Sequence, residues 1–128
     1  MKHSYHIGFL GYENLSELAR QVIQKGNLQD MEVLLLECTP DNLHEQLEYA
    51  ISRGCEAFIA GASNAAEFRR LSNLPLTEIY IRIADYVSAL KKAFAIGNLP
   101  VIFTYCFSSV PDLSSLHMIF NERFLHIT

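Results

Sequence analysis

The sequence of 128 residues lacks a long apolar run, a basic segment and a signal peptide. No stretch approaches the roughly 18 apolar residues that cross a membrane. The opening MKHSYHIGFLGY has neither the sustained apolar core nor the cleavage site of a secretory leader. The net charge of −4, without any run of Lys and Arg, excludes the electrostatic footprint of a nucleic-acid-binding domain. We therefore expect a cytoplasmic domain that contacts neither a membrane nor nucleic acid directly.

Cysteine and histidine are too few and too scattered for the common kinds of site. The three cysteines, Cys38, Cys55 and Cys106, form no Cys-x-x-Cys pair, and an odd number argues against a disulfide framework. The five histidines lack metal-ligand spacing, and no Gly-x-Ser-x-Gly motif supplies a nucleophile. The sequence therefore predicts no metal site, no cofactor and no enzymatic activity.

Glycine-rich phosphate-binding motifs are absent as well. A P-loop requires Gly-x4-Gly-Lys-Ser/Thr, which the sequence does not contain. The dinucleotide fingerprint requires three glycines in Gly-x-Gly-x-x-Gly spacing, whereas only Gly8 and Gly11 accompany the first apolar run. These absences exclude the two commonest nucleotide-binding loops.

What the sequence does contain is a regular alternation of strand and helix patterns, with half of its residues hydrophobic. Strands are expected at 5–10, 31–38, 57–61, 74–81 and 99–106, and an amphipathic helix follows each of the first four. Short connections between such elements favour right-handed crossovers and a parallel sheet covered on both faces. The predicted fold class is α/β, a flavodoxin-like three-layer sandwich around a five-stranded parallel sheet of order 2-1-3-4-5.

The regular alternation stops near residues 106–111, where Ser108, Ser109 and Pro111 interrupt it. We expect residues 1–107 to form one α/β lobe. Residues 108–128 are expected to hold a helix around 112–122 and a short extended end, as the start of a truncated or reduced second lobe.

Two loops of the predicted sheet are candidates for ligand binding. In open parallel sheets, ligands bind beyond the carboxyl ends of the strands where the strand order reverses. For the predicted order this place lies between residues 11–14 and residues 61–64, and both segments lead into a helix N-terminus that favours an anion. Ser63 and Asn64 are equally compatible with a purely structural role as helix caps.

A third candidate segment follows the fourth predicted strand. Arg82 could pair with a carboxylate, or could be a solvated loop charge. Asp85 could contact a ligand, or could stabilise the start of the next helix. The predicted ligand-binding residues are Tyr12, Gly61, Ser63, Asn64, Arg82 and Asp85.

Residues 54–93 resemble the N-terminal sensor domain of propionate-catabolism activators, the PrpR N-terminal family of sigma-54-dependent transcription regulators. The resemblance is carried by LPLTEI at 74–79 and by a following motif of Asp85, Tyr86, Val87, Ala89, Leu90 and Ala93. It implies a sensor lobe, one of two, that binds a small organic acid. It also implies contacts with DNA and sigma-54 RNA polymerase through an ATPase module and a helix-turn-helix domain outside this chain.

The resemblance departs from the family pattern at residues 60–65. Where family members often have SRGGTA, this sequence reads AGASNA, so the arginine and one glycine are missing. The resemblance implies a methylcitrate-type tricarboxylate as effector, but without the loop arginine we expect a different or less acidic ligand, or a degenerate sensor. The alternative function is a non-catalytic α/β interaction domain that forms a homodimer and binds no small ligand.

Overall fold

The computed structural model describes residues 4–97, 99–104, 110–120 and 123–127, and the chain divides into two compact units. The first unit is Met1–Ile79 and the second is Tyr80–Thr128. This division falls earlier in the chain than the break expected near residues 106–111.

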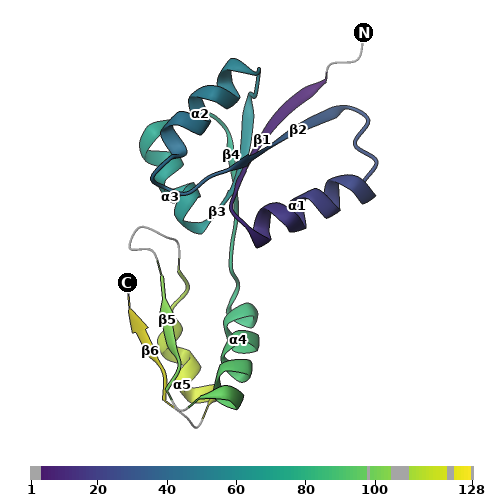
Figure 1. Ribbon diagram of the computed structural model, residues 1–128. Coiled ribbons are helices and arrows are strands. Elements are labelled where there is room, and N and C mark those ends of the chain that lie inside the picture. The colour runs from purple at the N-terminus through teal and green to yellow at the C-terminus, as the bar shows by residue number, and fades with distance from the viewer. Residues whose placement is uncertain (1–3, 98, 105–109, 121–122, 128) are drawn as a thin grey trace. The chain divides into compact units, whose positions relative to one another are not determined.

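The first unit is a parallel four-stranded sheet with helices on both faces. Its strands are β1 (Tyr5–Gly11), β2 (Met31–Glu37), β3 (Ala57–Gly61) and β4 (Leu76–Ile79), in the order β2-β1-β3-β4. Figure 1 shows that α2 (Leu43–Ser52) and α3 (Ala62–Leu71) cover one face, whereas α1 (Asn14–Lys25) lies on the other. The predicted α/β class and the order of the first four strands are confirmed.

The predicted fifth strand does not join this sheet. Instead, β5 (Val101–Phe103) pairs in parallel with β6 (Leu125–Ile127) in a separate two-stranded sheet of the second unit. The prediction of a five-stranded sheet was therefore wrong. The physical reason is a second core, in which Leu90 of α4 (Ile83–Ile96) packs with Leu113, Leu116 and Phe124.

The C-terminal segment is also less helical than expected. In place of one helix around 112–122, the described part of this segment, up to residue 120, has a 3-10 turn, η1 (Leu113–Ser115), followed by the short helix α5 (Leu116–Ile119). The expected extended end is present as β6, which pairs with β5 through the register Val101–Leu125 and Phe103–Ile127.

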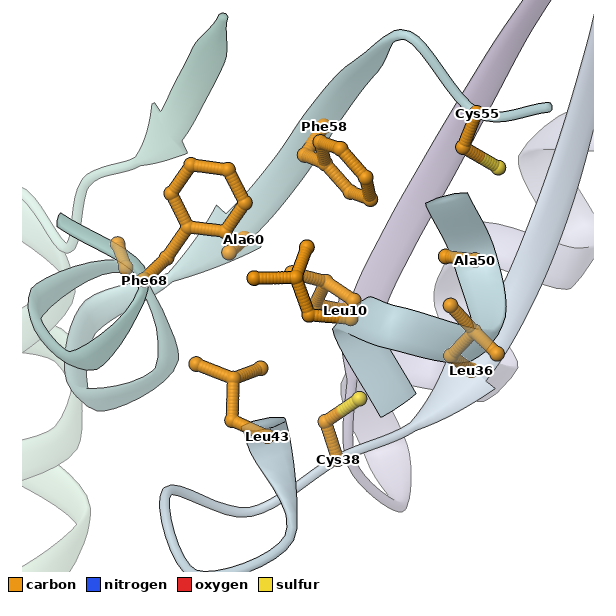
Figure 2. Packing of buried hydrophobic residues seen from close by; sticks show 11 residues of the cluster. Leu10, Leu36, Cys38, Leu43, Ala50, Cys55, Phe58, Ala60 and Phe68 are labelled. Carbon is orange, nitrogen blue, oxygen red and sulfur yellow. The ribbon is translucent and has the colours of Figure 1, made fainter. Parts of the chain in front are cut away.

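The main core fills the space between the sheet and the helices α2 and α3 (Figure 2). Alternate strand residues face this side, among them Leu10, Leu36 and Phe58, and each is almost fully buried. The ring of Phe58 packs against the ring of Phe68 on α3, with centroids 5.1 Å apart. Each such large side chain contributes about 1.5–3 kcal/mol by leaving water, which makes this layer the main source of stability.

Candidate functional site

The carboxyl edge of the four-stranded sheet contains the predicted topological switch point. The strands β1 and β3 are neighbours, and the connections after them lead to helices on opposite faces of the sheet (Figure 1). Two residues separate the end of β1 at Gly11 from the start of α1, whereas β3 runs directly into α3 at Gly61–Ala62. The order reverses between these strands, as it does where open α/β sheets bind ligands.

Tyr12 follows β1 at this edge and is about half exposed. The negative charge of Glu13 is the largest of the effects that raise the pKa of the Tyr12 hydroxyl, and a hydrogen bond to Glu13, burial and Glu37 add to it. Glu13 itself has a φ of 48°, and it is the one described non-glycine residue with positive φ. The phenol is therefore held in its protonated form beside two carboxylates.

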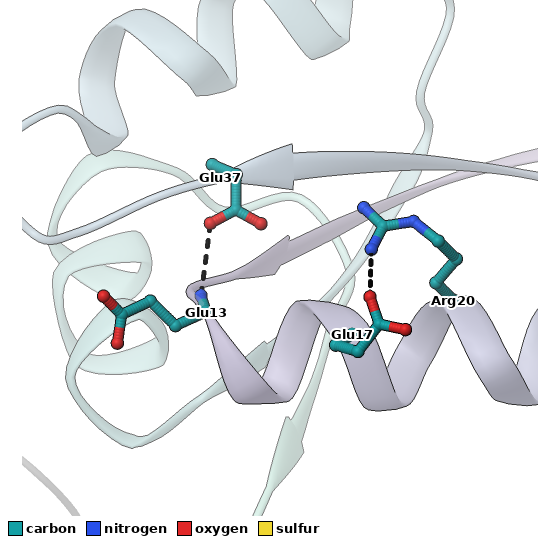
Figure 3. A network of polar contacts seen from close by, with 4 residues as sticks. All are labelled: Glu13, Glu17, Arg20 and Glu37. Carbon is teal, nitrogen blue, oxygen red and sulfur yellow. Dashed lines mark hydrogen bonds and ion pairs between the residues drawn. The ribbon is translucent and has the colours of Figure 1, made fainter.

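Glu37, a residue that the sequence reasoning did not single out, occupies the start of α1 (Figure 3). Its side chain extends from the end of β2, and its Oε2 accepts a hydrogen bond from the Glu13 N–H at 3.2 Å. The Ser16 hydroxyl lowers the pKa of Glu37 most, followed by the Glu13 amide, and the charge of Arg20 adds to this effect. An anionic carboxylate from the chain itself thus lies where the dipole of α1 favours negative charge.

Asn64 has a structural role that the sequence left open. It lies in the first turn of α3 and is 7% exposed, but the N-cap of this helix is Gly61, so Asn64 does not cap it. Its Nδ2 donates to the Cys38 carbonyl at 2.8 Å and to the Leu10 carbonyl at 3.4 Å. Asn64 therefore ties α3 to the ends of β1 and β2, and the predicted capping by Ser63 or Asn64 was wrong.

Gly61 and Ser63 lie where the sequence placed them, at the start of α3. Gly61 has no side chain, so the first amides of α3 receive no side-chain cap. A Cβ at Gly61 would lie 3.2 Å from Leu15 Cδ2, so a small residue lets α1 approach β3 closely. Neither α1 nor α3 has a side-chain cap; they differ in that the Glu37 carboxylate accepts from the N–H of Glu13, the residue just before α1.

Arg82 and Asp85 belong to the second unit and form the start of α4. The Arg82 N–H donates to Asp85 Oδ2 at 2.8 Å, and the Arg82 side chain is 81% exposed. Asp85 therefore has the helix-start role that the sequence analysis kept as its alternative. Within the first unit, the structure brings together Tyr12, Gly61, Ser63 and Asn64 at one edge and adds Glu13, Ser16 and Glu37 to them.

The second unit holds a hollow of about 410 Å³ that contains two histidines. Asp112 lies on its wall, but its Oδ1 accepts from both the Ser114 N–H and the Ser114 hydroxyl, which lower its pKa. His117 stacks on Phe124 with ring centroids 4.1 Å apart. These interactions stabilise the start of η1 and the small core of the second unit. They do not form an acid–base pair in the hollow.

The described residues form neither a metal site nor a reactive thiol. Among the described residues, no group of three or more His, Cys, Asp and Glu side chains could hold a metal ion. Burial raises the pKa of the Cys38 thiol to about 12 and also raises that of Cys55, so neither is a thiolate near neutral pH. Cys106 lies outside the described residues.

The described helices are also too short or too polar to cross a membrane. No family model matches the sequence, and no curated protein matches it. The fold places the protein in the α/β class. Its first unit is a parallel α/β sheet with a switch point between β1 and β3, and a small second α/β unit follows in the chain. The family resemblance of residues 54–93 stays a prediction from the quoted motifs.

Proposed function

We propose that this chain is a ligand-sensing domain of a sigma-54-dependent transcription regulator and performs no chemistry itself. Two things support the proposal: the motifs of residues 54–93 and a parallel α/β unit of the kind expected for a flavodoxin-like sensor lobe. The second unit would then be the beginning of a further lobe. The observation that carries the proposal is the start of α3 at the switch point, where no side chain caps the first amides of the helix.

The proposed effector is a small organic acid with one carboxylate. The first amides of α3, at Ala62 and Ser63, would receive that carboxylate, since a helix N-terminus favours an anion. Glu13 and Glu37 lie at the neighbouring start of α1, so additional carboxylates on the ligand would be repelled. This argument agrees with the absence of the loop arginine and favours a monocarboxylate over a tricarboxylate such as 2-methylcitrate.

Calorimetric titration of the full chain with a series of mono-, di- and tricarboxylates tests the ligand class. We expect binding heat with monocarboxylates and weaker binding as carboxylates are added. If no carboxylate gives heat, the ligand class is wrong. If affinity instead rises with the number of carboxylates, the electrostatic argument from Glu13 and Glu37 is wrong.

The binding position is tested with Ser63→Asp. This change puts a carboxylate in the first turn of α3, where it stabilises the helix by about 0.3–1 kcal/mol. The same carboxylate would compete with the effector, so affinity should fall although the fold is kept. The matched control is Asn73→Asp, which adds the same charge in the exposed turn before β4. Equal affinities for the two variants would move the site away from α3.

The regulatory setting needs a separate observation. An ATPase module and a helix-turn-helix domain encoded in the same reading frame would support the proposed contacts with sigma-54 RNA polymerase and DNA. A different neighbouring module would contradict the proposed role in sigma-54-dependent transcription. The proposal of ligand binding would then depend on the titrations only. The alternative, a non-catalytic interaction domain without a small ligand, is favoured by one observation, an apolar groove beside α1.

A further inference from the structure

One face of the four-stranded sheet is incompletely covered. On this face α1 is the single described helix of the first unit, whereas two helices cover the opposite face (Figure 1). An open groove of about 330 Å³ runs between α1 and the sheet. The side chains that line it are all apolar, and they include Phe9, Leu15, Leu18, Val22, Ile59 and Ile79.

The outer lip of this groove consists of large side chains that remain in water. Leu18 is 57% exposed and Val22, one helical turn further on, is 61% exposed. On the sheet side, Ile79 of the edge strand β4 is 37% exposed. A contiguous apolar surface of this kind marks an interaction site, because burying each such side chain contributes about 1.5–3 kcal/mol.

We propose that a second copy of this chain packs on this face, with the two α1 helices antiparallel across a two-fold axis. A two-fold interface requires one surface that complements itself. The Leu18–Val22 lip and the groove beside it run along the same helix, so the lip of each copy can enter the groove of the other. The groove volume has room for several aliphatic side chains.

The charges on α1 favour the antiparallel arrangement. Glu17 lies in the first turn of this helix, where its carboxylate also pairs with the Arg20 guanidinium one turn further on, and Lys25 lies in the last turn. In an antiparallel pair each Glu17 approaches the Lys25 of the other copy, and the two helix dipoles also oppose each other favourably. A parallel pair would bring like charges together at both ends. A second copy of this helix therefore offers the apolar side chains that the groove accepts and an opposite charge for Glu17 and Lys25 at each end.

Sedimentation velocity of the full chain without added ligand, over a concentration series, measures this association directly. We expect reversible dimers, and Leu18→Glu should raise the dimer dissociation constant roughly a hundredfold or more. The matched control is Ile51→Glu, which places the same charge at a 46% exposed position on α2 and should leave dimers intact. Circular dichroism confirms that both variants are folded. Monomers at every concentration, or dimers that Leu18→Glu leaves unchanged, overturn the proposal.

Charge reversal separates a second copy from any other partner. Glu17→Lys alone and Lys25→Glu alone should each weaken the dimer roughly tenfold at low salt. The double variant Glu17→Lys/Lys25→Glu should restore dimerisation, because both chains then carry the exchanged charges. A surface built for a different protein, or for an apolar small molecule, would not be restored in this way. Dimers without this restoration would place the contact elsewhere and reject the α1 pairing.

Discussion

At the scale of single residues, Asn64 connects three elements through one amide group. Its Nδ2 donates to carbonyls of Leu10 and Cys38, and both acceptors lie next to the buried ends of β1 and β2. A turn composed of Gly, Ala, Ser and Asn suggests a helix cap or a ligand loop from sequence alone. The chain uses Asn64 differently because β3 runs into α3 without a loop, which turns the asparagine inward rather than toward the helix start.

Replacing Asn64 by alanine should therefore lower stability by about 1–3 kcal/mol, because the Cys38 and Leu10 carbonyls lose their donor. Urea unfolding measures the change. The control Asn73→Ala, in an exposed turn, should stay within about 0.5 kcal/mol of the parent. Equal effects of the two variants would contradict the structural role of Asn64. A loss of effector affinity in Asn64→Ala is expected only if the sensor proposal holds.

Glu37 gives the stability a pH dependence whose sign follows from its pKa. The folded chain lowers the pKa of this carboxyl from its ordinary value of 4.5 through Ser16, the Glu13 amide and Arg20. The stabilisation is therefore complete above pH 4.5 and is lost as the pH falls through the lowered folded value. Glu37→Gln should lose less stability than the parent over this acid range.

Urea unfolding at a series of acid and neutral pH values checks this expectation. The matched control is Glu45→Gln, which removes an exposed carboxylate from the first turn of α2 and should keep the acid sensitivity of the parent. If Glu37→Gln and the parent lose stability in parallel on acidification, the carboxylate does not stabilise the start of α1.

At the scale of elements, the close packing of β1 on its neighbours depends on Gly8. A Cβ at this position would lie 2.7 Å from two ring carbons of Phe58, and this ring is itself fixed against Phe68. Because Phe58 is 1% exposed, the ring has no open space to move into. The sequence showed Gly8 only as one of two glycines near the first strand and gave no sign of this contact.

We therefore expect Gly8→Ala to destabilise the first unit by about 1–3 kcal/mol through overpacking. A double-mutant cycle with Phe58→Leu isolates the cause, since a smaller side chain leaves room for the new methyl group. The double variant should lose less stability than the two single changes together. Additive losses would show that the cost of Gly8→Ala does not come from the Phe58 ring.

At the scale of the whole molecule, sequence reasoning located helices and strands in both units but placed β5 in the wrong sheet. The strands β1 to β3 have apolar runs whose burial and pairing agree with a parallel sheet, so local periodicity was sufficient. The sequence pattern of the three residues of β5 is compatible with either sheet. The packing of Leu90 with Leu113 and Leu116 in the second core determines which sheet β5 joins. The sequence did not predict Glu37 as part of the polar site for a related reason: its hydrogen bond to Glu13 joins residues 24 positions apart in the chain.

The two units should also differ in their ability to fold alone. The first has a large core between the sheet and two helices. The described part of the second has four buried core residues and a two-stranded sheet, which is marginal by itself. A chain of residues 1–79 should give a cooperative urea transition, and a chain of residues 80–128 should not. Since α1 and its groove lie within residues 1–79, this shorter chain should also dimerise. Non-cooperative unfolding of residues 1–79 would mean that the first unit needs the second for its stability.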